Sequence, residues 1–309
     1  MSVSKKSILT LAAAALLVGC NKHDTISPGG GDEPDTPDTP TAGATYRPAT
    51  STSSMDKVTV LELRPAPGQF VQELEGPTHA DACRQAQAKL DANLYVSLGS
   101  FGGYIVVAFD HSVLNNGSDY DFAVAGNCFD GSNEPGIVWV SQDDNNNGLA
   151  DDQWYELRGS DYSAETTIKG YSVTYKKPAA EGDKVTWTDN QGASGTVDFG
   201  KWPLYITESE YTLTGTRLEP RNYKQGRQWI NPPYDGGYVD NAGSDLLADP
   251  AASAGDPLYN RFRIADAVDA AGIPVKLKFI DFIKVQTAVL TQSGPLGENS
   301  TEVLAFRDL

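Results

Sequence analysis

The chain has 309 residues, 39% of them hydrophobic, which is enough for one sizeable globular domain besides short terminal segments. Its net charge is −17, with 41 Asp and Glu against 24 Lys and Arg. We therefore expect no nucleic acid as a partner and little contact between the folded body and anionic lipid, because both partners would be negatively charged.

Residues 1–19 have the three parts of a secretion signal. Lys5 and Lys6 supply positive charge, residues 8–17 form an apolar run, and Leu17-Val18-Gly19 leads to Cys20. The run is too short to cross a hydrocarbon core of ~30 Å as a helix. A small residue before a cysteine is typical of a lipoprotein cleavage site, so we expect an acylated Cys20 to begin the mature chain. The alternative is a plain signal peptide with an incidental cysteine.

Residues 20–55 are rich in Gly, Pro, Thr, Ser and Asp, which bury little apolar surface, and they predict a disordered linker. Residues 56–309 then form a single domain. We expect the protein to lie at the outer membrane and to face the cell exterior, with the lipid anchor as its only membrane contact. Asn21-Lys22-His23-Asp24 loosely resembles the signal that sends some lipoproteins to the cell surface.

The body reads as short apolar runs separated by turn residues, with one helix. The helix begins after Thr78, with Asp81 three residues on and Cys83, Ala86 and Leu90 on one face. Many short strands without alternating helices favour an all-β fold, a jelly-roll β-sandwich. The clearest strand candidates are residues 58–63, 104–109, 137–140, 171–175, a hairpin over 185–199, and 280–289.

Two cysteines remain besides Cys20. Cys83 and Cys128 are an even number in an oxidising compartment, and we expect a disulfide between them. The alternative is that both are small, buried apolar side chains.

An Asx-rich loop follows the strand at 137–140. Oxygen-bearing residues recur at every second position around Gly148, as in loops that wrap around Ca²⁺. Trp154 stands where an EF-hand would place its bidentate Glu, and strands flank the loop, so this is not an EF-hand. The sequence predicts a structural calcium site; a polar turn without an ion is the alternative. The predicted ligands are Asp143, Asn145, Asn147, the carbonyl of Leu149, Asp151 and Asp152.

Several segments together resemble a known family. They are residues 98–112, 120–124, 134–141, 154–157, 262–269 and 280–285. These segments resemble discoidin-like, galactose-binding-type jelly rolls, and more specifically the cell-surface lipoproteins of Gram-negative gut bacteria. The resemblance covers roughly residues 63–309. It implies a sandwich that binds ligands at strand-end loops, in a group partly associated with outer-membrane uptake of vitamin B12 and glycans.

Recognisable catalytic patterns are absent from the sequence. His111 follows a strand end, but Asp110 and Ser112 are its neighbours in sequence and cannot form a triad with it. His111 is therefore either a residue at the rim of a binding loop or a packing histidine. Carboxylates abound, but no acid–base pair stands out.

The Gly- and Pro-bounded loop at residues 231–241 combines aromatic rings with amides and carboxylates, which suits a sugar or a corrinoid ring. The alternative for each ring is ordinary core packing. The candidate ligand-binding residues are Trp229, Tyr234, Asp235, Tyr238, Asp240, Asn241 and His111.

The sequence thus predicts a non-catalytic surface lipoprotein that captures a small-molecule or glycan ligand, or a vitamin such as cobalamin, and passes it to an outer-membrane transporter. A glycan-active hydrolase or lyase and an adhesin or surface-layer protein are the alternatives.

Overall fold

A computed structural model describes residues 43–73, 76–180, 182–247 and 257–309. These residues belong to a compact unit that spans residues 36–309. The predicted fold class is confirmed: strands in several open sheets make up 36% of the chain, with a single α-helix in the described ranges. The predicted signal peptide, Cys20 and the part of the predicted linker up to residue 42 lie outside the described residues. No helix in the described part of the chain is long and apolar enough to cross a membrane.

The main layer is a six-stranded sheet in the order β1-β3-β17-β6-β7-β15, and all its pairings are antiparallel. A three-stranded antiparallel sheet, β14-β5-β19, shares the largest hydrophobic core with it. Apolar side chains from both sheets and from the helix meet in this core, which makes the arrangement a sandwich. The strands are β1 (Thr59–Arg64), β3 (Tyr104–Ala108), β5 (Phe122–Gly126), β6 (Gly136–Ser141), β7 (Trp154–Leu157), β14 (Leu258–Phe262), β15 (Ala267–Val268), β17 (Phe282–Thr287) and β19 (Ala305–Asp308).

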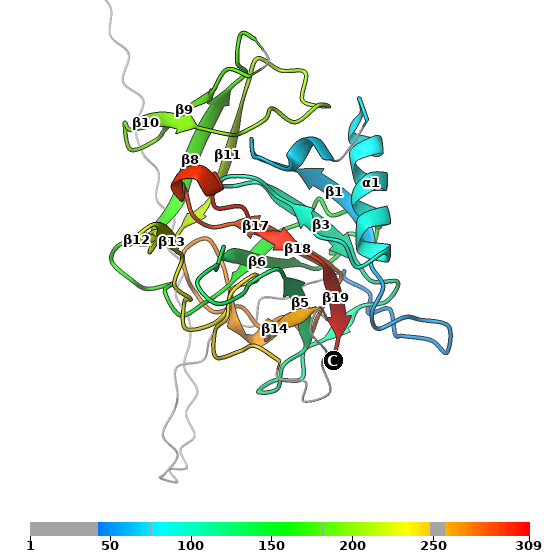
Figure 1. The fold of residues 1–309 in the computed structure, drawn as a ribbon. Helices are drawn as coiled ribbons and strands as arrows, with labels where there is room; N and C mark the ends of the chain where they lie inside the picture. The colour runs from blue at the N-terminus through cyan, green and yellow to red at the C-terminus, as the bar shows by residue number, and fades with distance from the viewer. Residues whose placement is uncertain (1–42, 74–75, 181, 248–256) are drawn as a thin grey trace, which may run out of the picture. The chain divides into compact units, whose positions relative to one another are not determined.

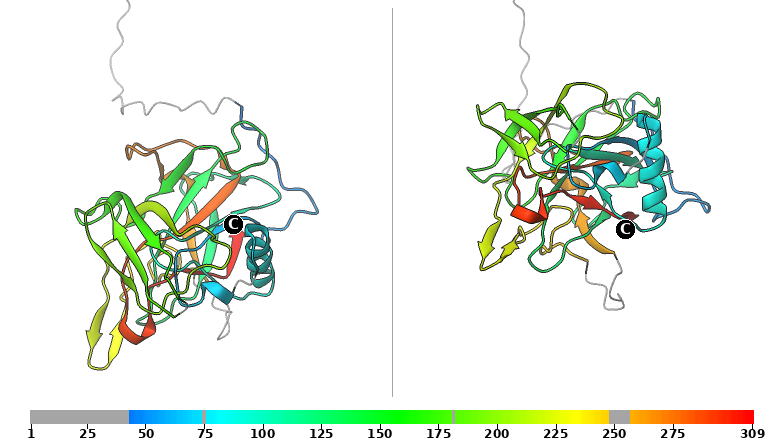
Figure 2. Two further views of the ribbon diagram at one scale, coloured as in Figure 1. Left: turned by 90° about the horizontal axis from the view of Figure 1, so that it is seen from above. Right: turned by 45° about the horizontal axis from the view of Figure 1, so that its top comes forward.

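A four-stranded sheet, β10-β9-β8-β11, has its own core, which includes Phe101 and Trp202. Both views in Figure 2 show β12 and β13 as a hairpin that projects from the body. The remaining elements are β8 (Ile168–Lys176), β9 (Val185–Asp189), β10 (Ser194–Val197), β11 (Glu210–Arg217), β12 (Tyr223–Gln225), β13 (Gln228–Ile230), the pairs β2 (Val96–Ser97) with β18 (Glu302–Val303) and β4 (Val113–Leu114) with β16 (Phe279–Ile280), and the 3-10 turns η1 (Val71–Glu73), η2 (Ile264–Asp266) and η3 (Gly294–Leu296).

The predicted helix is confirmed as α1 (His79–Asp91), which lies beside β1 (Figure 1). Thr78 and Asp81 form a reciprocal capping box, which satisfies two backbone N–H groups that the first turn leaves free. Ala82, Ala86 and Leu90 are buried in the main core. This packing fixes the helix against β1 and β2.

Two predicted boundaries are wrong, one at the C-terminal strand and one at the end of the linker, and the contact between Asp281 and Arg47 joins these two segments. The strand expected over 280–289 is divided at Asp281, which lies between β16, paired with β4, and β17, paired with β3 and β6. Its buried carboxylate accepts hydrogen bonds from Arg47 Nη2 at 3.0 Å, Ser112 Oγ at 2.6 Å and Asp143 N at 2.9 Å. Arg47 falls in the segment predicted as linker, and so does Tyr46, which packs on Phe279 at a ring distance of 5.5 Å. The structured body therefore includes residues 43–55.

Candidate functional site

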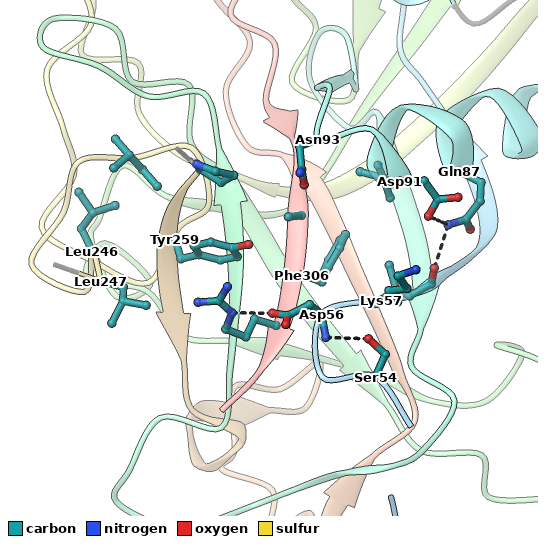
Figure 3. A pocket seen from close by; sticks show the side chains of 16 residues that line it. Ser54, Asp56, Lys57, Gln87, Asp91, Asn93, Leu246, Leu247, Tyr259 and Phe306 are labelled. Carbon is teal, nitrogen blue, oxygen red and sulfur yellow. Dashed lines mark hydrogen bonds and ion pairs between the residues drawn. The ribbon is translucent and has the colours of Figure 1, made fainter. Parts of the chain in front are cut away.

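A cavity of about 710 Å³ lies where α1, the segment before β1, β14 and β19 meet. Figure 3 shows Leu246 and Leu247 on one side of it, with Tyr259 and Phe306 between them and the polar side chains near Lys57. Phe306 is buried in the main core and Tyr259 is half-buried on β14. The cavity thus has aromatic and aliphatic walls and a polar opposite side, which is the usual composition of a ligand site.

The charged groups of the cavity balance. Two carboxylates, Asp56 and Asp91, face two cations, Lys57 and Arg307. Arg307 Nε donates to Asp56 Oδ1 at 2.6 Å, and its guanidinium lies 4.6 Å from the centre of the Tyr259 ring. These contacts hold one face of Tyr259 in place. A site without excess charge suits a neutral ligand better than a polyanion.

Gln87 joins the cavity to the scaffold. Its Oε1 accepts from Val60 N at 2.8 Å, and its Nε2 donates to Val58 O at 3.0 Å and to Asp91 at 3.1 Å. The oxygen and the nitrogen of this amide are thus both hydrogen-bonded, to Asp91 within α1 and to the backbone of the segment that enters β1. These bonds make the polar side of the cavity rigid. Rigid polar groups of this kind give orientation specificity at low entropic cost.

The predicted calcium loop connects β6 to β7, and the structure brings its side chains together. The carboxylate of Asp143 is buried and accepts from Asn147 N at 3.0 Å and Gly148 N at 2.9 Å. Asn147 Nδ2 donates to both oxygens of Asp151 at 3.2 Å, and Asn145 Nδ2 reaches Asp152 at 3.2 Å. The loop is therefore folded around its own carboxylates.

The loop gathers carboxylate oxygens of a kind that could hold a cation. Burial raises the pKa of Asp144, and the nearby Asp152, Asp143 and Asp281 raise it further. One Asp144 oxygen is buried without a hydrogen-bond partner. Side-chain amides of the loop lie beside Asp151 and Asp152.

A tighter carboxylate group lies elsewhere in the fold. Among the described residues, the three carboxylates whose oxygens lie within 4.8 Å of one another are Glu134, Asp240 and Glu302. None of the three belongs to the 143–152 loop.

The tyrosine loop, residues 231–241, does not form an open binding face, and that prediction is wrong. Tyr234 and Tyr238 are 3% and 1% exposed and pack edge to face at 5.5 Å. The Tyr234 hydroxyl donates to Glu219 O at 2.6 Å. The buried Asn241 clamps the Tyr234 backbone through both ends of its amide, at 2.8 and 3.0 Å. These rings are structural.

The other candidates of that group lie apart from the cavity. Asp240 is buried, Trp229 is half-buried on the β12–β13 hairpin, and Asp235 is exposed beside a different, smaller hollow. Sequence reasoning missed the groups that line the Tyr259 cavity. The sequence of β14, Leu258-Tyr259-Asn260-Arg261-Phe262, has no clear apolar alternation that would have identified them.

His111 is also buried, at 1% exposed, and acts as a bridge. Its Nδ1 lies 2.7 Å from Asp110 Oδ1 and its Nε2 lies 2.8 Å from Asp308 Oδ2. Burial acts to lower the pKa of His111, but the hydrogen bonds to Asp110 and Asp308 outweigh it, and the pKa is raised above 6.5. The packing interpretation of His111 is the one that the structure supports.

This bridge predicts a pH dependence of stability. Because the folded-state pKa of His111 is raised, its contribution is complete below pH 6.5 and is lost as the pH rises through the folded-state pKa. We expect the wild-type protein to lose on the order of 1 kcal/mol of stability as the pH rises above neutral, and the His111→Asn variant to lack this loss. Urea unfolding from pH 5.5 to 8.5 measures the difference. The same exchange at the exposed His79 is the matched control. An unchanged slope in His111→Asn would contradict the prediction.

The expected disulfide between Cys83 and Cys128 is not formed, because the two cysteines lie in different surroundings. Both are free. Cys83 on α1 lies 3.8 Å from the carbonyl of Leu61 in β1. Cys128 is buried beyond the end of β5, where burial raises its pKa to about 12. Of the alternative, two small buried side chains, only Cys128 is fully buried, and Cys83 is half-buried.

No protein-family model matches this chain, and no curated protein matches it significantly. The fold and the site therefore define the protein only as an all-β sandwich with an amphipathic, charge-balanced cavity.

Proposed function

We propose that this chain is a non-catalytic, lipid-anchored surface protein that captures a nutrient ligand for outer-membrane uptake. The ligand is a neutral glycan or a vitamin such as cobalamin. The observation that carries the proposal is the cavity beside Tyr259 and Phe306, whose volume of about 710 Å³ falls within the range of roughly 300–1,000 Å³ typical of small-molecule sites. Sugars and corrinoids both have an apolar face and a polar edge, and such a ligand would place its apolar face against the aromatic and aliphatic wall.

Two further features support this proposal. The charge balance of the cavity suits an uncharged ligand, whereas the chain as a whole is strongly acidic. In this proposal the 143–152 loop binds a structural calcium ion. Its charged ligands are Asp143, Asp151 and Asp152, and its neutral ligands are Asn145, Asn147 and the carbonyl of Leu149. Outside the cell, calcium is abundant enough for a weak site of this kind to be filled.

The binding site is tested with the Tyr259→Ala variant. We expect it to weaken binding of the captured ligand at least ~10-fold, because the ring forms a wall of the cavity and a buried aromatic contact contributes on the order of 1–2 kcal/mol. Cobalamin and a panel of neutral oligosaccharides are titrated by calorimetry. Tyr223→Ala, at a tyrosine 48% exposed on β12, is the matched control.

Two outcomes would contradict the capture proposal. One is that no ligand of the panel binds. The other is that Tyr259→Ala and Tyr223→Ala bind with equal affinity, since the ligand would then lie elsewhere. Release of a cleaved product during the titrations would favour the glycan-active enzyme instead.

The anchor is tested separately. Cys20→Ala removes the thiol that would be acylated, and we expect the protein to move from the membrane fraction to the soluble fraction. Loss of the acyl chains removes several kcal/mol of membrane affinity, at ~0.8 kcal/mol per buried CH₂. Fractionation followed by immunoblotting measures the change, and retention of the variant in the membrane would exclude a lipid anchor at this residue.

A further inference from the structure

Three acidic side chains from separate parts of the chain, none of which lines the Tyr259 cavity, converge inside the fold. Glu134 precedes β6, Asp240 lies at the end of the tyrosine loop, and Glu302 begins β18. One oxygen from each of the three lies within 4.8 Å of the other two. Asp240 and Glu302 are 1% and 6% exposed, and Glu134 is half-buried.

The scaffold holds these oxygens in place. Asp240 Oδ1 accepts from Asn127 N at 2.7 Å, and its Oδ2 accepts from Glu302 N at 3.0 Å. Asp240 has a left-handed backbone with φ of 58°, and the absence of a side chain on Gly126 makes room for it, because a Cβ there would lie 2.4 Å from the Asp240 Cα. A strained residue that is held this firmly is typical of a functional position.

A fourth carboxylate independently points to a ligand. Glu298 is 5% exposed, and its Oε1 accepts from Gln69 N at 2.6 Å. Its Oε2 is buried and has no hydrogen-bond partner. Glu298 lines a cavity of about 140 Å³ together with Glu134 and Glu302. A buried carboxylate oxygen without a partner is costly, so a group that would satisfy it is missing from the protein alone.

The charges of this cluster are not neutralised by the described part of the chain. Burial raises the pKa of both Glu134 and Glu298 to about 7, and it raises the pKa values of Asp240 and Glu302 well above their usual range. Within the described ranges, none of the observed ion pairs joins a lysine or arginine to any of these four carboxylates. The cluster must therefore hold protons or a cation.

We propose that Glu134, Asp240 and Glu302 bind a divalent cation, Ca²⁺, with Glu298 completing the shell directly or through water. Calcium takes about six to eight oxygens at roughly 2.3–2.6 Å, so two ligands of one ion lie up to about 5 Å apart, as these oxygens do. The cavity of about 140 Å³ leaves room for water ligands. The all-oxygen donor set disfavours zinc and copper, which prefer nitrogen and sulfur.

This site is separate from the 143–152 loop, and the experiment keeps the two apart. In full-length protein purified in detergent, Asp143→Ala and Asp151→Ala are combined to disable the loop, and CaCl₂ is titrated by calorimetry. We expect one Ca²⁺ to bind per chain. Adding Glu302→Gln should weaken that binding at least tenfold, and so should Glu134→Gln at the half-buried edge of the cluster. Glu165→Gln, at an exposed glutamate, should leave it unchanged.

Near-UV circular dichroism checks that each variant is folded, and Glu134→Gln provides the answer if Glu302→Gln does not fold. Failure of the loop-disabled protein to bind calcium at ~10 mM would overturn the proposal and leave the carboxylates sharing protons. Calcium binding that survives both Glu302→Gln and Glu134→Gln would overturn it equally. Neither result bears on capture at the Tyr259 cavity.

Discussion

The Gly103→Ala variant is expected to lose more than about 4 kcal/mol of stability, a large part of the ~5–15 kcal/mol available to a typical domain. A Cβ at Gly103 would lie 1.9 Å from Leu98 O and 2.5 Å from Ala66 N. Both are backbone atoms, and Ala66 N donates to Leu98 O at 2.9 Å, so neither can move without breaking a hydrogen bond beside β3. The strand itself must shift.

Urea unfolding followed by circular dichroism measures this effect. Gly117→Ala is the control, because Gly117 has a φ of +78° but no atom within 4 Å of a new Cβ. That exchange should cost only the backbone strain of about 1–2 kcal/mol. If the two variants unfold at the same urea concentration, steric contact at Gly103 is not the reason for glycine there.

The second large effect is expected from calcium and the 143–152 loop. If the site has the weak affinity of ~10⁻⁴–10⁻³ M typical outside cells, ~10 mM calcium should stabilise the fold by about 1.4–2.7 kcal/mol. For a domain of this size that corresponds to a rise in Tm on the order of 3–10 °C over the value in chelator. Binding only to the folded state produces this shift by mass action.

Two loop variants separate the stability that the loop gives without calcium from the stability that bound calcium adds. Asp143→Ala should also lose stability in chelator, by about 2–3 kcal/mol, because Asn147 N and Gly148 N lose their acceptor. Asp151 is exposed, so Asp151→Ala should mainly reduce the calcium response. Asp119→Ala, at an exposed aspartate on another loop, is the control. A wild-type Tm shift in both loop variants would show that the loop is a polar turn without an ion.

The features that local sequence determines were predicted well. The capping box of Thr78 and Asp81 and the spacing of Ala86 and Leu90 identify α1 without any distant contact. The Asx-rich loop could likewise be recognised from local sequence, because its oxygen-bearing residues follow one another at a fixed spacing. It connects the strands β6 and β7. Such patterns depend only on residues that are close together in the chain.

The tyrosine loop and the carboxylate cluster depend on distant residues and were not predictable. Tyr234 and Tyr238 stand in a loop-like sequence, but their hydroxyls are satisfied by the backbone of Glu219 and Asp161, whose positions the fold sets. The three carboxylates of the cluster come from separate parts of the chain, and Glu302 lies in β18, which pairs with the distant β2.

Asp281 shows the same limit in a strand. Its neighbours on both sides belong to strands, so the sequence reads as one continuous run. At this point the Asp281 carboxylate accepts a hydrogen bond from Arg47, which lies 234 positions away in the chain. No pattern within the run indicates that contact.

The proposed ligand cavity is likewise assembled from distant segments. Asp56 and Arg307, which pair at its edge, come from opposite ends of the body. Tyr259 becomes part of a binding wall only because β14 and β19 flank the same strand, β5. Residues 258–262 were not among the predicted strands, and nothing in their sequence indicates which segments they would meet.

Capture of a ligand at the Tyr259 cavity is tested most directly by hydrogen–deuterium exchange. The protein is compared with and without cobalamin, and with and without each oligosaccharide that calorimetry shows to bind. We expect bound ligand to slow amide exchange in residues 54–58, in β14 and in β19, which together border the cavity. Protection confined to other segments, such as the tyrosine loop or the β12–β13 hairpin, would contradict it.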